Sequence, residues 1–252
     1  MTVPIPQQQP IKPKQQCSLC DSLDLNALKH QNVPQKSYFH CQNCDLIFME
    51  EKDQVSLEAE KARYQDHQNF EDNEGYVQFL QKLVKPLTGI LRSSDFSFNS
   101  NRLTKNLSEL KALDYGCGPH PVLGKLFSGL GLNVENFDPY FFPREFLETD
   151  KWELILSTEV WEHFRQPKKE IAKQLQFLKT SGILGIMTQF HQGANHFSDW
   201  WYVRDLTHVV FYSQKTIQWI ATQFQLKILY ESNPVVIFQT KAAVLAQSWR
   251  VQ

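Results

Sequence analysis

The sequence lacks long apolar runs and any marked excess of charge. No segment reaches the roughly 18 consecutive apolar residues of a membrane span. Residues 1–16 are rich in proline and glutamine, without the apolar centre of a signal peptide. A formal net charge of −1 provides no general attraction to polyanions. We therefore expect a cytoplasmic protein with no membrane partner, and nucleic acid is disfavoured as a partner.

Cysteine is also scarce, yet four of the five cysteines form two C-x2-C pairs separated by 20 residues: Cys17, Cys20, Cys41 and Cys44. Four thiolates can close a tetrahedral shell around zinc and leave no open position for a catalytic water. The short stretches at 38–40 and 45–49 predict strands of a hairpin too small to have its own core. The pattern predicts a structural zinc ribbon. A platform for a substrate or partner and a zinc-free module with inert thiols are the alternatives.

The remaining chain is long enough for one full domain. Residues 75–91 carry apolar side chains at helical spacing, interrupted by Pro86, and the Ser/Asn-rich residues 92–106 predict a loop. Strands and helices then alternate, which predicts a mainly parallel sheet covered on both faces. The expected strands are 110–114, 133–137, 152–157, 183–187, 226–230 and 235–240, and the expected helices are 121–130, 167–179 and 213–225. The last two strands should be antiparallel because only a short turn joins them.

A glycine turn follows the first of these strands. Gly116 and Gly118 flank Cys117 there, and glycines allow a ligand to approach the backbone closely. The next strand ends at Asp138, 20 positions after Gly118, where a carboxylate can accept both hydroxyls of a ribose. The third glycine of the dinucleotide fingerprint is absent, which disfavours an NAD-linked oxidoreductase. A tight turn without a ligand is the alternative interpretation.

These residues resemble the motifs of class I methyltransferases. The run from Asp114 to Pro119 is similar to their nucleotide-binding motif, 158–164 to their fourth-strand motif and 178–187 to their fifth-strand motif. The cysteine pairs resemble an N-terminal module of some bacterial methyltransferases. The resemblance implies an α/β, Rossmann-like sheet that is mostly parallel, with the last strand antiparallel. Because the segment from Asp138 to Trp152 is short, the usual third strand should be abbreviated or missing.

The same resemblance implies that S-adenosylmethionine is the cofactor. The residues expected to face it are Asp114, Gly116, Cys117, Gly118, Asp138, Thr158 and Glu159. The expected organisation is a flexible tail at 1–16, a zinc ribbon at 17–50, a helical linker region at 51–106 and the cofactor-binding methyltransferase domain at 107–252.

An aromatic and histidine-rich segment at 188–213 follows the expected strand at 183–187. Ligands of parallel sheets lie beyond the carboxyl ends of the strands, so this segment predicts a substrate wall. Its candidate substrate-binding residues are His191, Trp200, Trp201, Tyr202, Arg204 and Asp205. Imidazole titrates near neutrality, and His208, then His163, are the candidate catalytic bases. Structural histidines and core aromatics are the alternatives.

We therefore expect methyl transfer from S-adenosylmethionine to a small-molecule acceptor, with a structural Zn²⁺. A non-catalytic binding module of the same fold is one alternative. An RNA-modifying enzyme that reads RNA with the zinc ribbon is the other. The sequence leaves the acceptor and the oligomeric state open.

Overall fold

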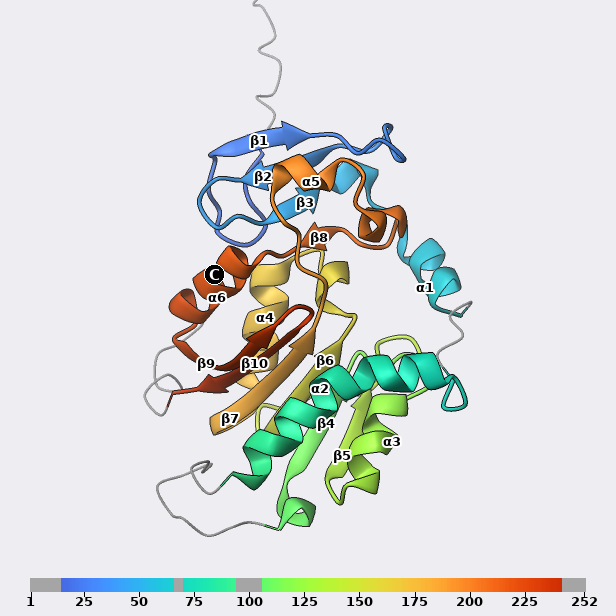
Figure 1. Cartoon of the computed structure of the whole chain (residues 1–252), viewed down its shortest axis with the longest axis vertical. Helices are drawn as coiled ribbons and strands as arrows, with labels where there is room; N and C mark the ends of the chain where they lie inside the picture. The colour runs from blue at the N-terminus through green and yellow to red at the C-terminus, as the bar shows by residue number, and fades with distance from the viewer. Residues whose placement is uncertain (1–14, 66–69, 94–105, 242–252) are drawn as a thin grey trace, which may run out of the picture.

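The computed structural model describes residues 15–65, 70–93 and 106–241. Most of the expected tail and of the loop expected at 92–106 lie outside these ranges. Two sheets dominate the structure, a large one below and a small one above it in Figure 1. Within the described ranges, no helix combines the length and the apolar character of a membrane span.

The large sheet has six strands in the order β5-β4-β6-β7-β10-β9. Their bounds are β4 Lys111–Tyr115, β5 Asn133–Phe137, β6 Trp152–Thr158, β7 Leu178–Met187, β9 Leu226–Ser232 and β10 Val235–Thr240. Strands β5, β4, β6 and β7 run parallel, whereas β10 is antiparallel to both β7 and β9. This topology confirms the predicted mostly parallel sheet with an antiparallel last strand.

The large sheet has no strand between β5 and β6 in the chain, and its strand β7 is longer than expected. Residues 139–151 contain no strand, and a single bridge joins Asp138 to Phe142, so the usual third strand is missing as expected. Strand β7 begins at Leu178, earlier than the predicted 183, because Trp152 of β6 pairs with Leu178 before the register shifts. Gly182 therefore lies within the strand instead of preceding it.

Helices cover both faces of the sheet, as strand alternation requires. Leu154 and Leu156 of β6 pack under α2 (Glu74–Arg92) and α3 (Val122–Gly129). Ile155 points to the other face, with α4 (Pro167–Gln176) and α6 (Gln214–Gln223). Helix α2 continues past Pro86, so this proline does not divide the helix as the sequence suggested.

The small sheet has the order β1-β2-β3-β8 and combines distant parts of the chain. Its strands are β1 Leu25–Leu28, β2 Tyr38–Cys41, β3 Ile47–Met49 and β8 Val210–Phe211. Strand β8 comes from the aromatic segment and pairs antiparallel with β3. The cysteine module thus lies over the edge at which β6 and β7 end (Figure 1).

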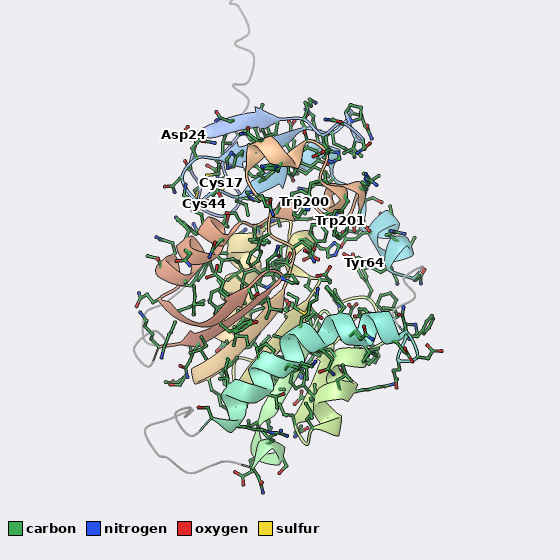
Figure 2. The ribbon with its side chains drawn as sticks, in the orientation of Figure 1. Cys17, Asp24, Cys44, Tyr64, Trp200 and Trp201 are labelled. Atoms are coloured by element: carbon green, nitrogen blue, oxygen red, sulfur yellow. The ribbon has the colours of Figure 1, made fainter. Side chains whose placement is uncertain are left out.

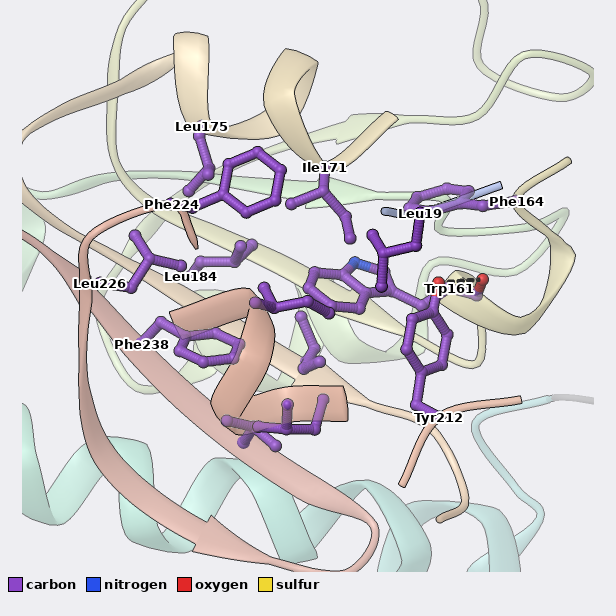
Figure 3. Packing of buried hydrophobic residues seen from close by; sticks show 14 of the residues in the cluster. Leu19, Trp161, Phe164, Ile171, Leu175, Leu184, Tyr212, Phe224, Leu226 and Phe238 are labelled. Atoms are coloured by element: carbon purple, nitrogen blue, oxygen red, sulfur yellow. Dashed lines mark hydrogen bonds between the residues drawn. The ribbon is translucent and has the colours of Figure 1, made fainter. Parts of the chain in front are cut away.

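The two sheets share one hydrophobic core. Leu19, Leu46 and Phe48 of the cysteine module belong to the same buried cluster as Trp161 and Ile171 of the large domain. Figure 3 shows Leu19 beside Trp161 within this cluster. The module is therefore packed as part of the molecule, and the apolar area that it buries is shared with the large sheet.

Short elements complete the chain between these units. They are η1 Glu51–Asp53, α1 Leu57–Gln65, η2 Leu107–Glu109, η3 Trp161–His163, α5 Ala194–Phe197 and η4 Trp201–Arg204. Helix α1 lies between the small sheet and α2 along the chain. Together with η3 and η4, it borders a large cavity.

Candidate functional site

A turn with two left-handed glycines joins β4 to α3. Gly116 and Gly118 have φ angles of 83° and 64°, a region that glycine enters without steric penalty. The N–H groups of Gly116 and Cys117 both donate to the Phe137 carbonyl, at 2.8 and 3.1 Å. A Cβ at Gly116 would lie 2.5 Å from a methyl group of Val160. Both the backbone angle and the close packing therefore require glycine at 116.

Asp138 holds this turn against the end of β5. Its Oδ2 accepts the Gly118 N–H at 3.1 Å, and its Oδ1 accepts the N–H groups of Tyr140 and Phe141 at 2.8 and 3.1 Å. The side chain is nearly buried but contributes to the wall of a cavity. A carboxylate can accept about four hydrogen bonds, so capacity for a further donor remains.

Asp114 lies beneath the turn, buried and outside the cavity wall. Its Oδ2 accepts the N–H of Gly124 in α3 at 3.1 Å. Burial raises the pKa of Asp114 to about 7, because the charged form loses its hydration. Its contact with Gly124 supports the position of the turn and of α3.

Two glutamates follow the end of β6, Glu159 partly buried and Glu162 fully buried. Glu159 has a φ of 54° and donates its N–H to the Met187 carbonyl at 2.9 Å. Glu162 in η3 is fully buried, and its Oε1 accepts the Tyr202 hydroxyl at 2.5 Å; the same hydroxyl lies 3.4 Å from Oε2 of Glu159. Burial raises the pKa of both carboxyls, and the charge of Glu162 adds to the effect on Glu159.

The structure brings His163 and His208 together on the cavity wall. Their ring centroids are 4.9 Å apart. Nδ1 of His163 lies 3.0 Å from the Thr207 carbonyl, and Nδ1 of His208 lies 2.8 Å from the Tyr202 carbonyl. Burial lowers the pKa of His163, so its neutral form is favoured.

The cavity has a volume of about 1200 Å³ and reaches from the glycine turn to these histidines. Ligand pockets in proteins usually measure about 300–1,000 Å³, so two ligands can be accommodated side by side. Of the candidate residues, the following line it: Gly116, Cys117, Gly118, Asp138, Thr158, Glu159, His163, Trp201, Tyr202, Arg204, Asp205 and His208.

Two candidate substrate residues lie elsewhere. His191 is buried against the cysteine module, with Nε2 2.9 Å from the Asp45 carbonyl, and it does not line the cavity. Trp200 packs on Tyr202 and Phe211 behind the wall, also outside the lining. Trp201, in contrast, lines the cavity, and Figure 2 shows it toward Tyr64, another residue of the cavity wall.

Sequence reasoning missed the contribution of α1 and α2 to the cavity. Tyr64 of α1 packs edge-on against the His163 ring, with centroids 5.2 Å apart. Glu60 forms an ion pair of 2.8 Å with Arg165, and Tyr76 of α2 lines the same cavity as the glycine turn. The sequence assigned residues 51–106 to a helical linker region, and only the aromatic side chains of Tyr64 and Tyr76 could have indicated a role in the cavity.

The four paired cysteines meet in a compact cluster. One Sγ atom from each lies within 4.8 Å of the others, with 3.6 Å between Cys17 and Cys44 and 3.4 Å between Cys20 and Cys41. The hydrogen bond with Cys44 lowers the pKa of Cys17 to about 6, and the same bond raises the pKa of Cys44. A central divalent cation would favour all four thiolates, so the donor set fits zinc.

The two cysteine pairs also share a backbone turn. In each, the residue after the second cysteine, Asp21 or Asp45, has a positive φ (58° and 64°) and donates its N–H to the first cysteine carbonyl at 3.0 Å. The repeated turn aims both thiols of a pair at the same point.

A family model described as a methyltransferase domain matches residues 76–231, more than half of the chain. The chain therefore belongs to this family of S-adenosylmethionine-dependent methyltransferases, as the motifs suggested. None of the curated proteins has a sequence that matches the chain significantly.

Several solved methyltransferase structures are similar to the chain. Magnesium protoporphyrin IX methyltransferase from Synechocystis PCC 6803, with bound S-adenosylhomocysteine, is 13% identical over 75% of this chain and 89% of its own, with a TM-score of 0.45. Human N-acetylserotonin methyltransferase, in complex with S-adenosylmethionine, is 12% identical over 67% and 57%, with a TM-score of 0.41. An O-methyltransferase family 2 protein from Planctomyces limnophilus is 12% identical over 64% and 60%, with a TM-score of 0.39. Likenesses this low do not identify a substrate.

Proposed function

We propose that the chain transfers a methyl group from S-adenosylmethionine to a small-molecule acceptor within the 1200 Å³ cavity. One observation carries the proposal: the glycine turn with Asp138 and the His163–His208 pair line the same cavity. A cofactor on the turn and an acceptor beside the histidines would meet within it, and such positioning is the main requirement of an in-line displacement.

For the cofactor, we assign the glycine turn and the residues at the ends of β5 and β6. Gly116, Cys117 and Gly118 would border the amino acid and ribose, and Asp138 would accept a ribose hydroxyl. Thr158 and Glu159 would flank the sulfonium side, where aromatic rings favour positive charge. Asp114 would support the turn from below.

For the acceptor, we assign the wall opposite the turn. Its side chains are Trp201, Tyr202, Arg204, Asp205, His163 and His208. Arg63 from α1 pairs with Asp205 at 3.2 Å and contributes to the same wall. We propose that His208, with His163 beside it, engages the nucleophilic atom of the acceptor as a base or hydrogen-bond partner.

The cofactor assignment is tested by calorimetry with S-adenosylhomocysteine. Asp138→Ala should weaken binding by about 1–3 kcal/mol, the range for lost hydrogen bonds to a charged group. Glu135→Ala is the matched control, because Glu135 lies on β5, the strand that ends just before Asp138, but outside the cavity, and it should bind normally. Equal affinity of folded Asp138→Ala and wild-type protein would contradict the assignment.

The acceptor assignment is tested by transfer of labelled methyl groups to a panel of small phenols, alcohols and amines. His208→Asn should keep the affinity for S-adenosylhomocysteine and lose about 100- to 10,000-fold in rate, the usual range for general-base assistance. Cofactor binding without transfer to any compound of the panel would instead favour a non-catalytic binding module.

We also propose one structural Zn²⁺ on Cys17, Cys20, Cys41 and Cys44. The cluster is buried beside the shared core, and a closed four-thiolate shell has no position for substrate. Thiolate ligation requires reduced cysteines, which is consistent with the cytoplasm as the expected compartment.

A further inference from the structure

A second group of possible metal ligands lies at the acceptor side of the cavity. One carboxylate oxygen of Glu162 and one ring nitrogen each of His163 and His208 lie within 4.8 Å of one another. Glu162 and His163 are neighbours in η3, whereas His208 precedes β8 in the distant aromatic segment. The fold therefore assembles the group from two segments, and both histidines line the cavity.

Hydrogen bonds to backbone carbonyls determine the tautomer of both imidazoles. A carbonyl oxygen can only accept, so the contacts of Nδ1 with the Thr207 and Tyr202 carbonyls, at 3.0 and 2.8 Å, place the proton on Nδ1. In each neutral ring the lone pair is then on Nε2. Histidines that bind metals commonly donate their other ring N–H to a carbonyl in this way, which orients the ring and raises its basicity.

Glu162 supplies an anionic ligand for the same place. Its side chain is fully buried, Oε1 accepts the Tyr202 hydroxyl, and Oε2 makes no hydrogen bond of standard geometry in the described part of the chain, although the Thr188 side chain interacts with the carboxyl and lowers its pKa. Oε1 of the neighbouring Glu159 is likewise buried and without a hydrogen-bond partner among those residues. Buried carboxylate oxygens are costly without a partner, and a bound cation would provide one.

We propose that Glu162, His163 and His208 bind a divalent transition-metal ion at the acceptor end of the cavity. Two imidazoles and one carboxylate suit Zn²⁺, Mn²⁺ or Fe²⁺ better than the oxygen-preferring Mg²⁺ or Ca²⁺. Three protein ligands leave coordination positions for an exogenous oxygen, in contrast to the closed shell of the four cysteines.

Such an ion indicates a hydroxyl-bearing acceptor, a phenol or an alcohol, and this step rests on the proposed function. A metal-bound hydroxyl loses its proton to water more easily, and the resulting oxyanion is the nucleophile. An O–CH₃ bond forms while the S–CH₃ bond of the cofactor breaks, and that electron pair stays on sulfur to give S-adenosylhomocysteine. With the metal bound, the two imidazoles act as its ligands in place of the base role proposed above, and the metal keeps its oxidation state.

The test uses Mn²⁺ as the probe, because thiolates bind it weakly and the cysteine site prefers zinc. Titration of the full chain, followed by the electron paramagnetic resonance signal of free Mn²⁺, should reveal one site. His163→Ala, His208→Ala and Glu162→Gln should each weaken it by at least about 10- to 100-fold. His196→Ala is the matched control, because His196 is exposed in α5 outside the cavity, and it should bind as the wild type does.

Calorimetry with S-adenosylhomocysteine on the same variants separates the possible failures. Retained affinity shows that a variant is folded, so loss of Mn²⁺ binding can be attributed to the removed ligand. The metal proposal is overturned, and the proposed function is not, if wild-type protein binds S-adenosylhomocysteine but no Mn²⁺. The same holds if His163→Ala and His208→Ala still bind Mn²⁺ as the wild type does. Failure of the wild-type protein to bind S-adenosylhomocysteine overturns the proposed function instead.

Discussion

Replacing Asp45 by alanine should loosen the cysteine module from the methyltransferase sheet. Oδ2 of Asp45 accepts the hydroxyl of Ser213, the N-cap of α6, at 2.6 Å, and Oδ1 lies 2.8 Å from Nε2 of His40. Although burial raises the pKa of Asp45, these two hydrogen bonds outweigh burial and keep that pKa below its usual value. The carboxylate therefore connects β2, the second cysteine turn and α6.

Two contributions set the size of the effect. The bond between Ser213 and a charged carboxylate contributes about 1.5–3 kcal/mol. The left-handed φ of 64° costs alanine roughly 1–2 kcal/mol more than it costs aspartate or asparagine. Asp45→Ala should thus lower the free energy of unfolding by about 2.5–5 kcal/mol. Asp45→Asn should lose less, because the amide oxygen can still accept from Ser213 and asparagine tolerates this φ.

Asp21 offers a matched control for the backbone contribution. It occupies the same position in the first cysteine turn, with a φ of 58°, but its half-exposed carboxylate contacts only the exposed Lys168 among the described residues. Asp21→Ala therefore carries the backbone penalty without losing a buried bond. The difference between Asp45→Ala and Asp21→Ala should be about 1.5–3 kcal/mol.

Urea denaturation measures the loss of stability in Asp45→Ala and in Asp21→Ala. Tryptophan fluorescence reports on Trp161 in the shared core, and a chromophoric chelator reports the release of zinc. Because the module and the large sheet share that core, both signals should shift together to lower urea in Asp45→Ala. Equal midpoints for Asp45→Ala and Asp21→Ala would refute the reasoning, as would zinc release that shifts while the fluorescence midpoint stays unchanged.

Three further predictions concern the turn, the buried acid and the metal. Gly116→Ala should bind S-adenosylhomocysteine at least about 10-fold more weakly in calorimetry, because its Cβ would clash with Val160. Gly118 also has a positive φ, but a Cβ there would meet no other atom, so Gly118→Ala should lose less affinity. A larger loss in Gly118→Ala than in Gly116→Ala would contradict this reasoning. The pKa of Asp114 is raised from 3.8 to about 7, so its contribution to stability is complete below 3.8 and lost as pH rises through 7. When the pH falls from 7.5 to 5, the free energy of unfolding of the wild-type protein should rise by about 2–3 kcal/mol more than that of Asp114→Asn, as measured by urea titration. If the unfolding free energies of the two proteins change in parallel with pH, the raised pKa is wrong. Elemental analysis should find one zinc per chain, bound by the four cysteines. Cys44→Ser should lose this zinc and unfold at a lower urea concentration. Wild-type protein that is equally stable with and without zinc would exclude a structural metal.

The sequence by itself determined the alternating strands and helices and the residues of the glycine turn. These features are local: apolar periodicity reports which face of an element is buried, and a glycine turn between a strand and a helix has few alternatives. Asp138 could be placed beside Gly118 because adjacent parallel strands end at the same edge of the sheet. The two C-x2-C pairs were equally readable, since four thiols have few other uses in a reducing compartment.

Only the tertiary structure decided which distant segments share a surface. Strand β8 pairs with β3, and His191 contacts the Asp45 carbonyl instead of the cavity, although the sequence placed His191 and His208 in the same expected substrate wall. Tyr64 reaches the cavity from α1, a charged helix in what the sequence indicated as a helical linker region. The physical reason is that periodicity shows that a side chain is buried but not what it is buried against, and those partners are brought together only when the whole chain packs around one core.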